Sequence, residues 1–526
     1  MIKENLKYIV LLIFIGCGIS CTDKFLDAVP NDQLSGPTFW KTENDVNMAL
    51  AGAYRGWENG MNIAMGDAMT DNDYSHLAVT GYQQVGNGTV SPQNVLVGTG
   101  LRAFSYVQIR KYNNFLENVE KTSLSTVLKD KLKAEVRFLR AYDYFLKVMF
   151  FGDMPLVINV VPSNELPART PATQIHTFIL DELEKISKIL PVQNVVTSKG
   201  HITAGAALAL KARLELFMGK YDDAMTSSKA VIDMGVYELY PNYEQLFYRQ
   251  NKANNKESIA EIQHIQNDYF TSIPWQRLPS FKGGYAENAV SRSMVDAYET
   301  SNGFTILQDP AYNPNKPFDN RDPRLAMSIA YPGSLWFGRI YTALNPQITG
   351  ASNPDYYLND GSKAGQMSRK YLDPLIQNAE RQNFDAPIMV IRLAEMYLTY
   401  AEAAVEAGKN QVLGLEYLNK LRTRAGHIKA TALTRDLVRR ERRVELAFEG
   451  LRYFDVKRWD LGPTVMAGPY QGSRLGTVNT SNGEVTWSSG YIVVENRTFY
   501  PARKYLLPIP QSEMDVNPKM TQNPGY

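Results

Sequence analysis

Two segments of the chain repeat one design, and they constrain the fold more than any other feature. Residues 203–235 and 392–426 each read as a helix with small residues on one face, a glycine break at Gly219 or Gly408, and a second helix. Glycine tolerates the left-handed turn that ends a helix. The design is typical of tetratricopeptide units, whose helix pairs stack on their neighbours. The two segments therefore predict a mainly α-helical frame.

The rest of the chain divides into helical and loop-rich parts. We expect further helices at 43–57, 102–121, 128–150, 173–189 and 434–448. Proline, glycine and aromatic residues become common in 265–385 and again in 462–505, with short strands expected at 485–487 and 490–495. Long loops on a helical scaffold usually carry function. We expect one domain over 21–526, with a helical frame at about 36–264 and 386–461 and a ligand region in the loops.

The expected helix at 434–448 is densely charged. It carries several arginines and glutamates close together, namely Arg439, Arg440, Glu441, Arg442, Arg443, Glu445 and, just beyond it, Glu449. Every acid has an arginine within one turn, so we interpret the helix as a ladder of i, i+4 ion pairs rather than a carboxylate site.

The N-terminus has the three parts of a secretory signal. Lys3 and Lys7 precede an apolar run at 9–15, and small residues follow it. A bilayer-spanning helix needs about 20 apolar residues, and this run is too short. We therefore expect residues 1–20 to be a cleaved export signal.

A cysteine lies where the signal ends. A thiol directly after a small-residue cleavage site resembles a bacterial lipobox, whose cysteine is acylated. We favour Cys21 over the rival Cys17 as the lipidated residue. Because the chain has only these two cysteines, the exported body can form no internal disulfide.

Composition and motifs exclude several classes of function. The net charge of +2 provides no basic field for nucleic acid. The five histidines are scattered, which disfavours a zinc site. No GxSxG, P-loop or correctly placed GxGxxG occurs. We expect no enzyme activity, metal or cofactor.

Aromatic residues are abundant, with 31 Tyr, 21 Phe and 6 Trp. Tyrosine combines an apolar ring with a polar tip. Sugars present apolar faces and many hydroxyls, so they are suitable ligands for such a surface.

Six blocks in order resemble the SusD/RagB family of outer-membrane lipoproteins, nearly end to end. They are "CTDKFLDAVP", "FWKTENDVNMALAGAY", "AEVRFLRAYDYFLKVMFFGDMPLV", "RLAEMYLTYAEA", "ERRVELAFEGLRYFDVKRW" and "LLPIPQSEMDVNPKMTQNPGY". The resemblance implies a tetratricopeptide-like frame with loop-rich insertions, lipid-anchored on the cell surface at the outer membrane. It also implies a non-catalytic protein that captures glycan oligomers and delivers them to a SusC-like TonB-dependent transporter.

The aromatic residues in the loops are the candidates for ligand binding. We single out Trp275, Tyr285, Trp336, Phe337 and Tyr341, and we hypothesise that the 331–341 loop carries an exposed stacking platform.

Other residues are weaker candidates for ligand binding. Asp73 and Tyr74, together with Asp71, could accept sugar hydroxyls beside the platform, and Tyr356 and Tyr357 are weaker aromatic candidates. Family members often carry a stacking Trp shortly before the helix at 106–117, where this chain offers only Phe104. This departure suggests a ligand other than starch.

The family blocks also hold residues that we expect to be structural. Arg137, Arg140, Arg452, Trp40 and Trp459 should serve packing and buried ion pairs. Two alternatives stay open for the function: a RagB-like receptor that captures peptides and, with less support, a surface glycosidase with paired carboxylates.

Overall fold

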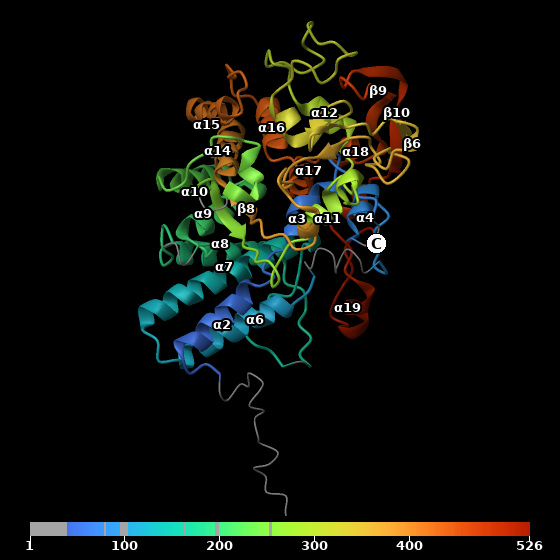
Figure 1. Cartoon of the computed structure of the whole chain (residues 1–526). Coiled ribbons are helices and arrows are strands. Elements are labelled where there is room, and N and C mark those ends of the chain that lie inside the picture. The colour runs from blue at the N-terminus through green and yellow to red at the C-terminus, as the bar shows by residue number, and fades with distance from the viewer. Residues whose placement is uncertain (1–38, 78–79, 95–103, 163, 195–198, 252–254) are drawn as a thin grey trace, which may run out of the picture.

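The structure is a computed structural model that describes residues 39–77, 80–94, 104–162, 164–194, 199–251 and 255–526. The expected signal segment and both cysteines lie outside these residues. Helices stack from α2 and α6 at the lower end of the molecule to α15 at the upper end, and loops with small sheets lie beside the upper half (Figure 1).

The helices predicted from the sequence are present, with ends that differ by a few residues. The longer helices are α2 (Glu43–Tyr54), α6 (Val107–Asn118), α7 (Thr126–Phe151), α8 (Ala172–Ser187), α9 (Ala204–Phe217), α10 (Tyr221–Asp233), α14 (Leu393–Ala407), α15 (Gln411–Arg424) and α16 (Arg435–Glu445). The shorter ones are α3 (Gly60–Met65), α4 (Tyr82–Asn87), α11 (Ile273–Arg277), α12 (Arg292–Ala297), α13 (Arg324–Ser328), α17 (Arg452–Arg458), α18 (Gly462–Val465) and α19 (Gln511–Val516).

Local sequence explains where the helices begin and end. The Thr42 hydroxyl accepts a hydrogen bond from the Asp45 amide, and the Asp45 carboxylate accepts one from the Thr42 amide, which is a capping box at the start of α2. The α7 helix begins after Ser125, whose hydroxyl accepts from the Leu128 amide, and ends at Gly152, where φ is 72°. Capping satisfies backbone groups that a helix end leaves without partners.

The two helix–glycine–helix segments form adjacent hairpins. Gly219 and Gly408 have φ of 71° and 67°, so each supplies the predicted left-handed break. The helices α9, α10, α14 and α15 pack in that order. A Cβ on Gly414 of α15 would lie 3.3 Å from the Cα of Ala401 and 3.2 Å from the Cβ of Ala404. Small residues therefore set the close approach of α14 and α15.

Aromatic side chains fill the junction between α7, α9 and α17. Phe150 lies 5.1 Å from Phe454 between ring centroids, and Phe217 lies 5.9 Å from Phe454. All belong to the large hydrophobic core or pack against it. Large aromatic side chains dominate the free energy of such cores.

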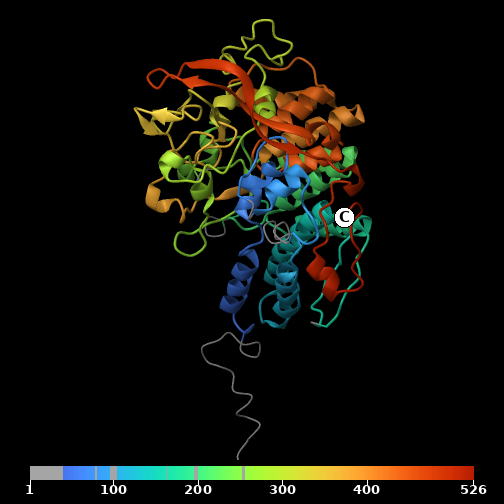
Figure 2. The same ribbon diagram turned by 90° about the vertical axis from the view of Figure 1, so that its right-hand side faces the viewer.

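Within the described residues, five small antiparallel sheets accompany the helices. Their strands are β1 (Ser258–Ile262) with β8 (Ile388–Arg392), β9 (Gly468–Val478) with β10 (Val485–Arg497), β2 (Ile329–Ala330) with β7 (Met367–Ser368), β3 (Leu335–Trp336) with β4 (Arg339–Ile340), and β5 (Gln347–Ile348) with β6 (Ala351–Ser352). The two strands predicted at 485–487 and 490–495 are both part of β10. Its long hairpin with β9 curves over the upper half of the molecule (Figure 2).

The charged helix α16 differs from the prediction. Its residues pair with other elements rather than along the helix: Glu445 binds Arg324, Arg392 and Arg424 of α13, β8 and α15. Arg442 binds Asp455 of α17. The predicted i, i+4 ladder is therefore wrong. The spacing within a helix cannot reveal partners that the fold brings in from elsewhere.

The arginines of the family blocks have the predicted structural role. Arg137 and Arg140 of α7 bind Glu182 of α8, at 2.7 and 3.2 Å. Arg452 binds the buried Asp71 at 2.9 Å. These pairs join neighbouring helices and tie α17 to the segment that precedes α4.

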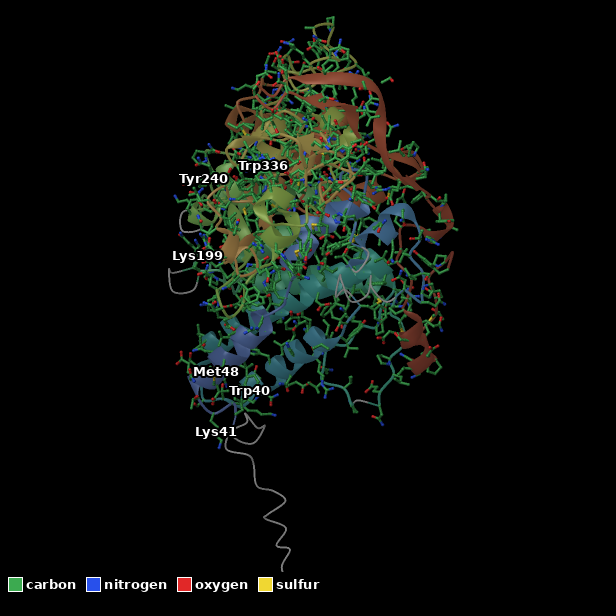
Figure 3. The ribbon with its side chains drawn as sticks, turned by 45° about the vertical axis from the view of Figure 1, so that its right-hand side comes forward. Trp40, Lys41, Met48, Lys199, Tyr240 and Trp336 are labelled. Carbon is green, nitrogen blue, oxygen red and sulfur yellow. The ribbon has the colours of Figure 1, made fainter. Side chains whose placement is uncertain are left out.

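The two tryptophans expected to be structural are half-buried and pack on the frame. Trp40 meets the ring of Phe115 edge-on, with centroids 5.6 Å apart, at the lower end of the molecule (Figure 3). The Trp459 indole donates to Glu402 Oε1 at 2.7 Å.

Candidate functional site

Two aromatic residues of the loop-rich region, Trp275 and Tyr285, pack against each other at the surface. Their ring centroids are 4.9 Å apart and their planes are tilted by 58°. Trp275 is part of α11 and half-buried, whereas Tyr285 is 47% exposed. The pair offers an angled apolar surface with a phenol hydroxyl at its edge.

Two glycines bring the pair together. Gly283 has φ of 72°, and a Cβ on Gly284 would lie 2.2 Å from the Leu278 carbonyl oxygen. Only glycine fits both positions. The chain therefore reverses after the short helix at Ser280–Lys282 and returns Tyr285 onto Trp275.

Backbone hydrogen bonds fix this turn. The Tyr285 amide donates to the Trp275 carbonyl at 3.1 Å, and the Trp275 amide donates to the Arg381 carbonyl at 3.0 Å. The Ala286 amide donates to the Leu278 carbonyl at 3.0 Å. Three backbone bonds therefore fix the main chain that carries both rings.

Two phenylalanines continue the surface. Phe281 and Phe337 meet edge-on with centroids 6.3 Å apart. Phe337 and Gly338 form the two-residue turn of the β3–β4 hairpin, both with positive φ, of 47° and 76°. This is the backbone that tight hairpins require, and it is unusual for a phenylalanine. We call Trp275, Phe281, Tyr285 and Phe337 the aromatic surface.

Trp336 and Tyr341 are not exposed, contrary to expectation. Trp336 is 4% exposed and Tyr341 is 1% exposed, and both belong to a buried cluster beneath the aromatic surface. The Trp336 ring lies 5.0 Å from that of Phe337. The hypothesis that Trp336 forms a ligand-binding platform is therefore wrong, because its ring is buried. The alternation of the short strands turns Trp336 inward, and Figure 3 places it among densely packed side chains.

Asp71 is enclosed by arginines. Burial alone would raise the pKa of Asp71, but the Arg443 and Arg452 guanidinium groups outweigh it and lower the pKa to about 2. The carboxylate joins α16 and α17 through these two ion pairs.

Asp73 and Tyr74 are also buried, so the prediction that they meet sugar hydroxyls finds no support in their positions. Asp73 Oδ1 accepts from the amides of Tyr74 and Ala289, both at 2.9 Å, and its other oxygen accepts from the Asn288 side chain. Burial raises the pKa of Asp73 to about 6, against the opposing charge of Arg277.

The weaker aromatic candidates are half-buried, and Phe104 is buried. Tyr356 and Tyr357 are half-buried and meet edge-on with centroids 4.7 Å apart. Phe104 is 6% exposed, packs against Phe151 with 5.2 Å between ring centroids, and is not part of the aromatic surface.

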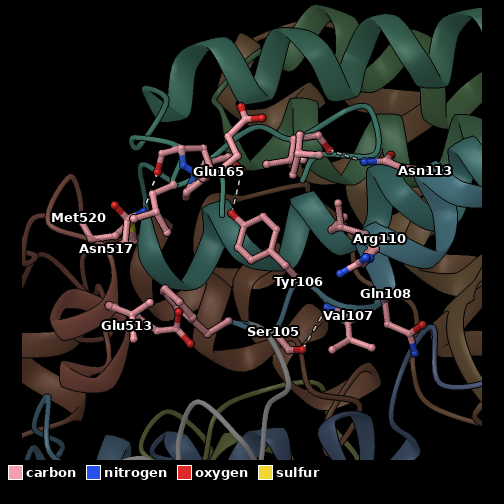
Figure 4. Close-up of a pocket in the computed structure, with 18 of the residues that line it drawn as sticks. Ser105, Tyr106, Val107, Gln108, Arg110, Asn113, Glu165, Glu513, Asn517 and Met520 are labelled. Carbon is pink, nitrogen blue, oxygen red and sulfur yellow. Dashed lines mark hydrogen bonds between the residues drawn. The ribbon is translucent and has the colours of Figure 1, made fainter. Parts of the chain in front are cut away.

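A separate groove of about 910 Å³ lies between the start of α6, the 155–167 loop and α19 (Figure 4). Val107 and Val516 are exposed in it, and the Tyr106 hydroxyl donates to the Pro155 carbonyl at 2.7 Å. It shares no residue with the aromatic surface. Three segments that are distant in the chain build this groove, so no local sequence pattern indicates it.

Two further features concern the described part of the chain: metal-binding groups and membrane-spanning helices. No group of three or more His, Cys, Asp or Glu side chains there is placed to hold a metal ion. Likewise, none of the described helices combines the length and apolarity needed to cross a bilayer.

Comparison with known families gives two matches that together span most of the chain. The family model described as "SusD family" matches residues 243–526, which is more than half of the chain. The model described as "Starch-binding associating with outer membrane" matches residues 24–216.

Individual proteins are similar along most of their length. SusD-like protein P2 of Formosa agariphila is 25% identical, over 100% of both chains. The starch-binding protein SusD of Bacteroides thetaiotaomicron is 25% identical over 80% of this chain and 76% of its own. The crystal structure of a SusD-like carbohydrate binding protein from Bacteroides fragilis superposes with a TM-score of 0.83 and 28% identity, covering 92% of this chain and 100% of that one.

Proposed function

The chain belongs to the SusD family, and we propose that it is a non-catalytic receptor that binds glycan oligomers at the cell surface. The observation that carries the proposal is the Trp275–Tyr285 pair. Backbone hydrogen bonds fix the main chain of this pair, so less of the loop has to be ordered when a ligand binds. The names of the starch-binding and carbohydrate-binding relatives support a glycan as the ligand.

The proposed contacts follow from exposure. The Tyr285 ring stacks on the apolar face of a sugar, with Trp275 as the second wall and Phe337 at the edge. Trp336 and Tyr341 belong to the buried cluster against which Phe337 packs.

Attachment and delivery complete the proposal. Residues 1–20 are removed, Cys21 receives the lipid, and residues 21–526 act as one domain at the outer membrane. Because one acyl chain binds a membrane only marginally, firm anchoring needs more than one. A SusC-like TonB-dependent transporter then takes the glycan that the receptor has captured.

The test is electrophoresis of the chain from Thr22 onward on native gels cast with a panel of polysaccharides, with a peptide digest as a parallel competitor. We expect retardation by at least one glycan, and loss of that retardation in Trp275→Ala. Binding of the peptides alone would replace the proposal with a peptide receptor. Hydrolysis of a retained glycan would contradict the non-catalytic role.

A further inference from the structure

Three cations surround the aromatic surface. The Lys282 ammonium lies 5.2 Å from the ring centroid of Phe337, and the Arg339 guanidinium lies 4.2 Å from that of Phe281. Arg381 lies against the turn between them, since a Cβ on Gly283 would be 3.1 Å from Arg381 Nη1. The positive groups therefore rest on or beside the same rings.

These cations have few carboxylate partners. Arg339 has one distant partner, Asp355, at 3.7 Å, and its side chain remains 37% exposed. Among the described residues, neither Lys282 nor Arg381 has a carboxylate within ion-pair distance. By contrast, the buried Arg392 binds three glutamates. These three cations therefore form a local excess of positive charge in a chain whose net charge is only +2.

The nearby acids do not compensate the cations. Glu380, next to Arg381 in the chain, binds Arg249 at 2.8 Å, and Asp385 binds the same Arg249 at 3.3 Å. Asp355 is buried, and its Oδ1 accepts from the Phe281 amide. Asp360, in the adjoining loop, is exposed, and its backbone carbonyl accepts a hydrogen bond from the Ser280 hydroxyl. Of these four acids, Asp360 alone is exposed, beside three cations.

We propose that the aromatic surface binds an anionic glycan, with its sugar face on Tyr285 and its carboxylate or sulfate groups on Lys282 and Arg381, and with Arg339 at the far edge. The proposal rests on the proposed function and names the ligand class of that site. Three neighbouring cations repel one another, and an anionic ligand relieves the repulsion while forming charge-assisted hydrogen bonds. Such binding weakens as salt screens the charges.

The experiment compares matched ligands that differ only in charge. The chain from Thr22 onward is titrated with oligogalacturonate and with the same oligomer fully methyl-esterified, and with a sulfated galactan and its desulfated form. These arms distinguish carboxylate from sulfate. Each titration is repeated at low and high salt, and with the variants Lys282→Gln and Lys282→Gln/Arg381→Gln.

The chain offers a matched control in Lys420→Gln. The Lys420 ammonium also lies on an aromatic ring, 5.2 Å from the centroid of Tyr417, but on α15, which carries no part of the aromatic surface. Loss of binding in Lys282→Gln but not in Lys420→Gln assigns the effect to the site rather than to net charge.

We expect one charged ligand to bind at least about tenfold more tightly than its neutral form, and Lys282→Gln to remove about tenfold of that affinity. Equal binding of charged and neutral forms, or binding unaffected by Lys282→Gln, would overturn the anionic inference while leaving glycan binding intact. Failure of every charged ligand also overturns it. Retention of a neutral polysaccharide, lost in Tyr285→Ala, would show in that case that the proposed function survives.

Discussion

The Tyr285 amide donates a hydrogen bond to the carbonyl of Trp275 at 3.1 Å, while the two rings pack with centroids 4.9 Å apart. The same two residues therefore meet through both backbone and side chain. This double contact makes the exposed pair a rigid element rather than a loop that a ligand must order.

Trp336→Ala should lower stability rather than ligand affinity. Removing a buried indole leaves a cavity, so we expect the free energy of unfolding to fall by about 3–5 kcal/mol. Because Trp275 is half-buried, Trp275→Ala should lower the free energy of unfolding less than Trp336→Ala does. It should weaken glycan binding more. Urea denaturation and glycan titration of both variants check this contrast, and an unchanged unfolding midpoint for Trp336→Ala would contradict it.

Glu445→Gln should destabilise the frame strongly. Burial alone would raise the pKa of Glu445, but Arg424, Arg392 and Arg324 around it lower the pKa far below its usual value. Removing the charge leaves buried guanidinium groups uncompensated, at a cost of about 3–5 kcal/mol.

The control for this variant is Glu416→Gln, an exposed glutamate that pairs with Lys420 along α15. It should change the free energy of unfolding by no more than about 0.5 kcal/mol. Urea unfolding of both variants gives the comparison, and similar midpoints would show that the ion network contributes little.

Glu287 should make stability depend on pH near neutrality. Burial raises the pKa of Glu287 to about 7 and that of Asp73 to about 6, while Arg277 opposes both shifts. A carboxyl whose pKa is raised by folding stabilises the protein below its unfolded pKa, and this contribution is lost as pH rises through 6 to 7.

Glu287→Gln should therefore flatten the pH profile of the unfolding free energy between pH 5 and 8, by up to about 3 kcal/mol. The Ser75 hydroxyl, which donates to Glu287, keeps an acceptor in the glutamine. Glu484→Gln, at an exposed position, is the control and should leave the slope unchanged. A variant profile as steep as that of the natural chain would refute the assignment.

Cys21→Ser should release the protein from the membrane. Cys17→Ser should not, because Cys17 lies within the segment that is removed. Fractionation of cells, with the mass of the mature N-terminal peptide, distinguishes the two cysteines. Release by Cys17→Ser alone would move the lipid to the rival position.

The helical frame could be read from the sequence because its signals are local. Alanine-rich faces and the breaks at Gly219 and Gly408 act within a few residues of the structure that they specify. The choice of Trp336 failed because glycines and prolines nearby indicate a loop but not which way a side chain points. The cations around the aromatic surface stayed hidden for another reason: Lys282, Arg339 and Arg381 are far apart in the chain, and the near-zero net charge masks a local excess.

The most direct test of the central claim is the affinity of Tyr285→Ala for the glycan that retards the natural chain most strongly, measured by calorimetric titration. Tyr500→Ala is the matched control, because Tyr500 is 45% exposed and also meets a cation, Arg503. We expect the affinity of Tyr285→Ala for this glycan to be at least about tenfold lower than that of the natural chain. The affinity of Tyr500→Ala should equal that of the natural chain. Equal affinity of Tyr285→Ala and the natural chain would show that the glycan binds elsewhere.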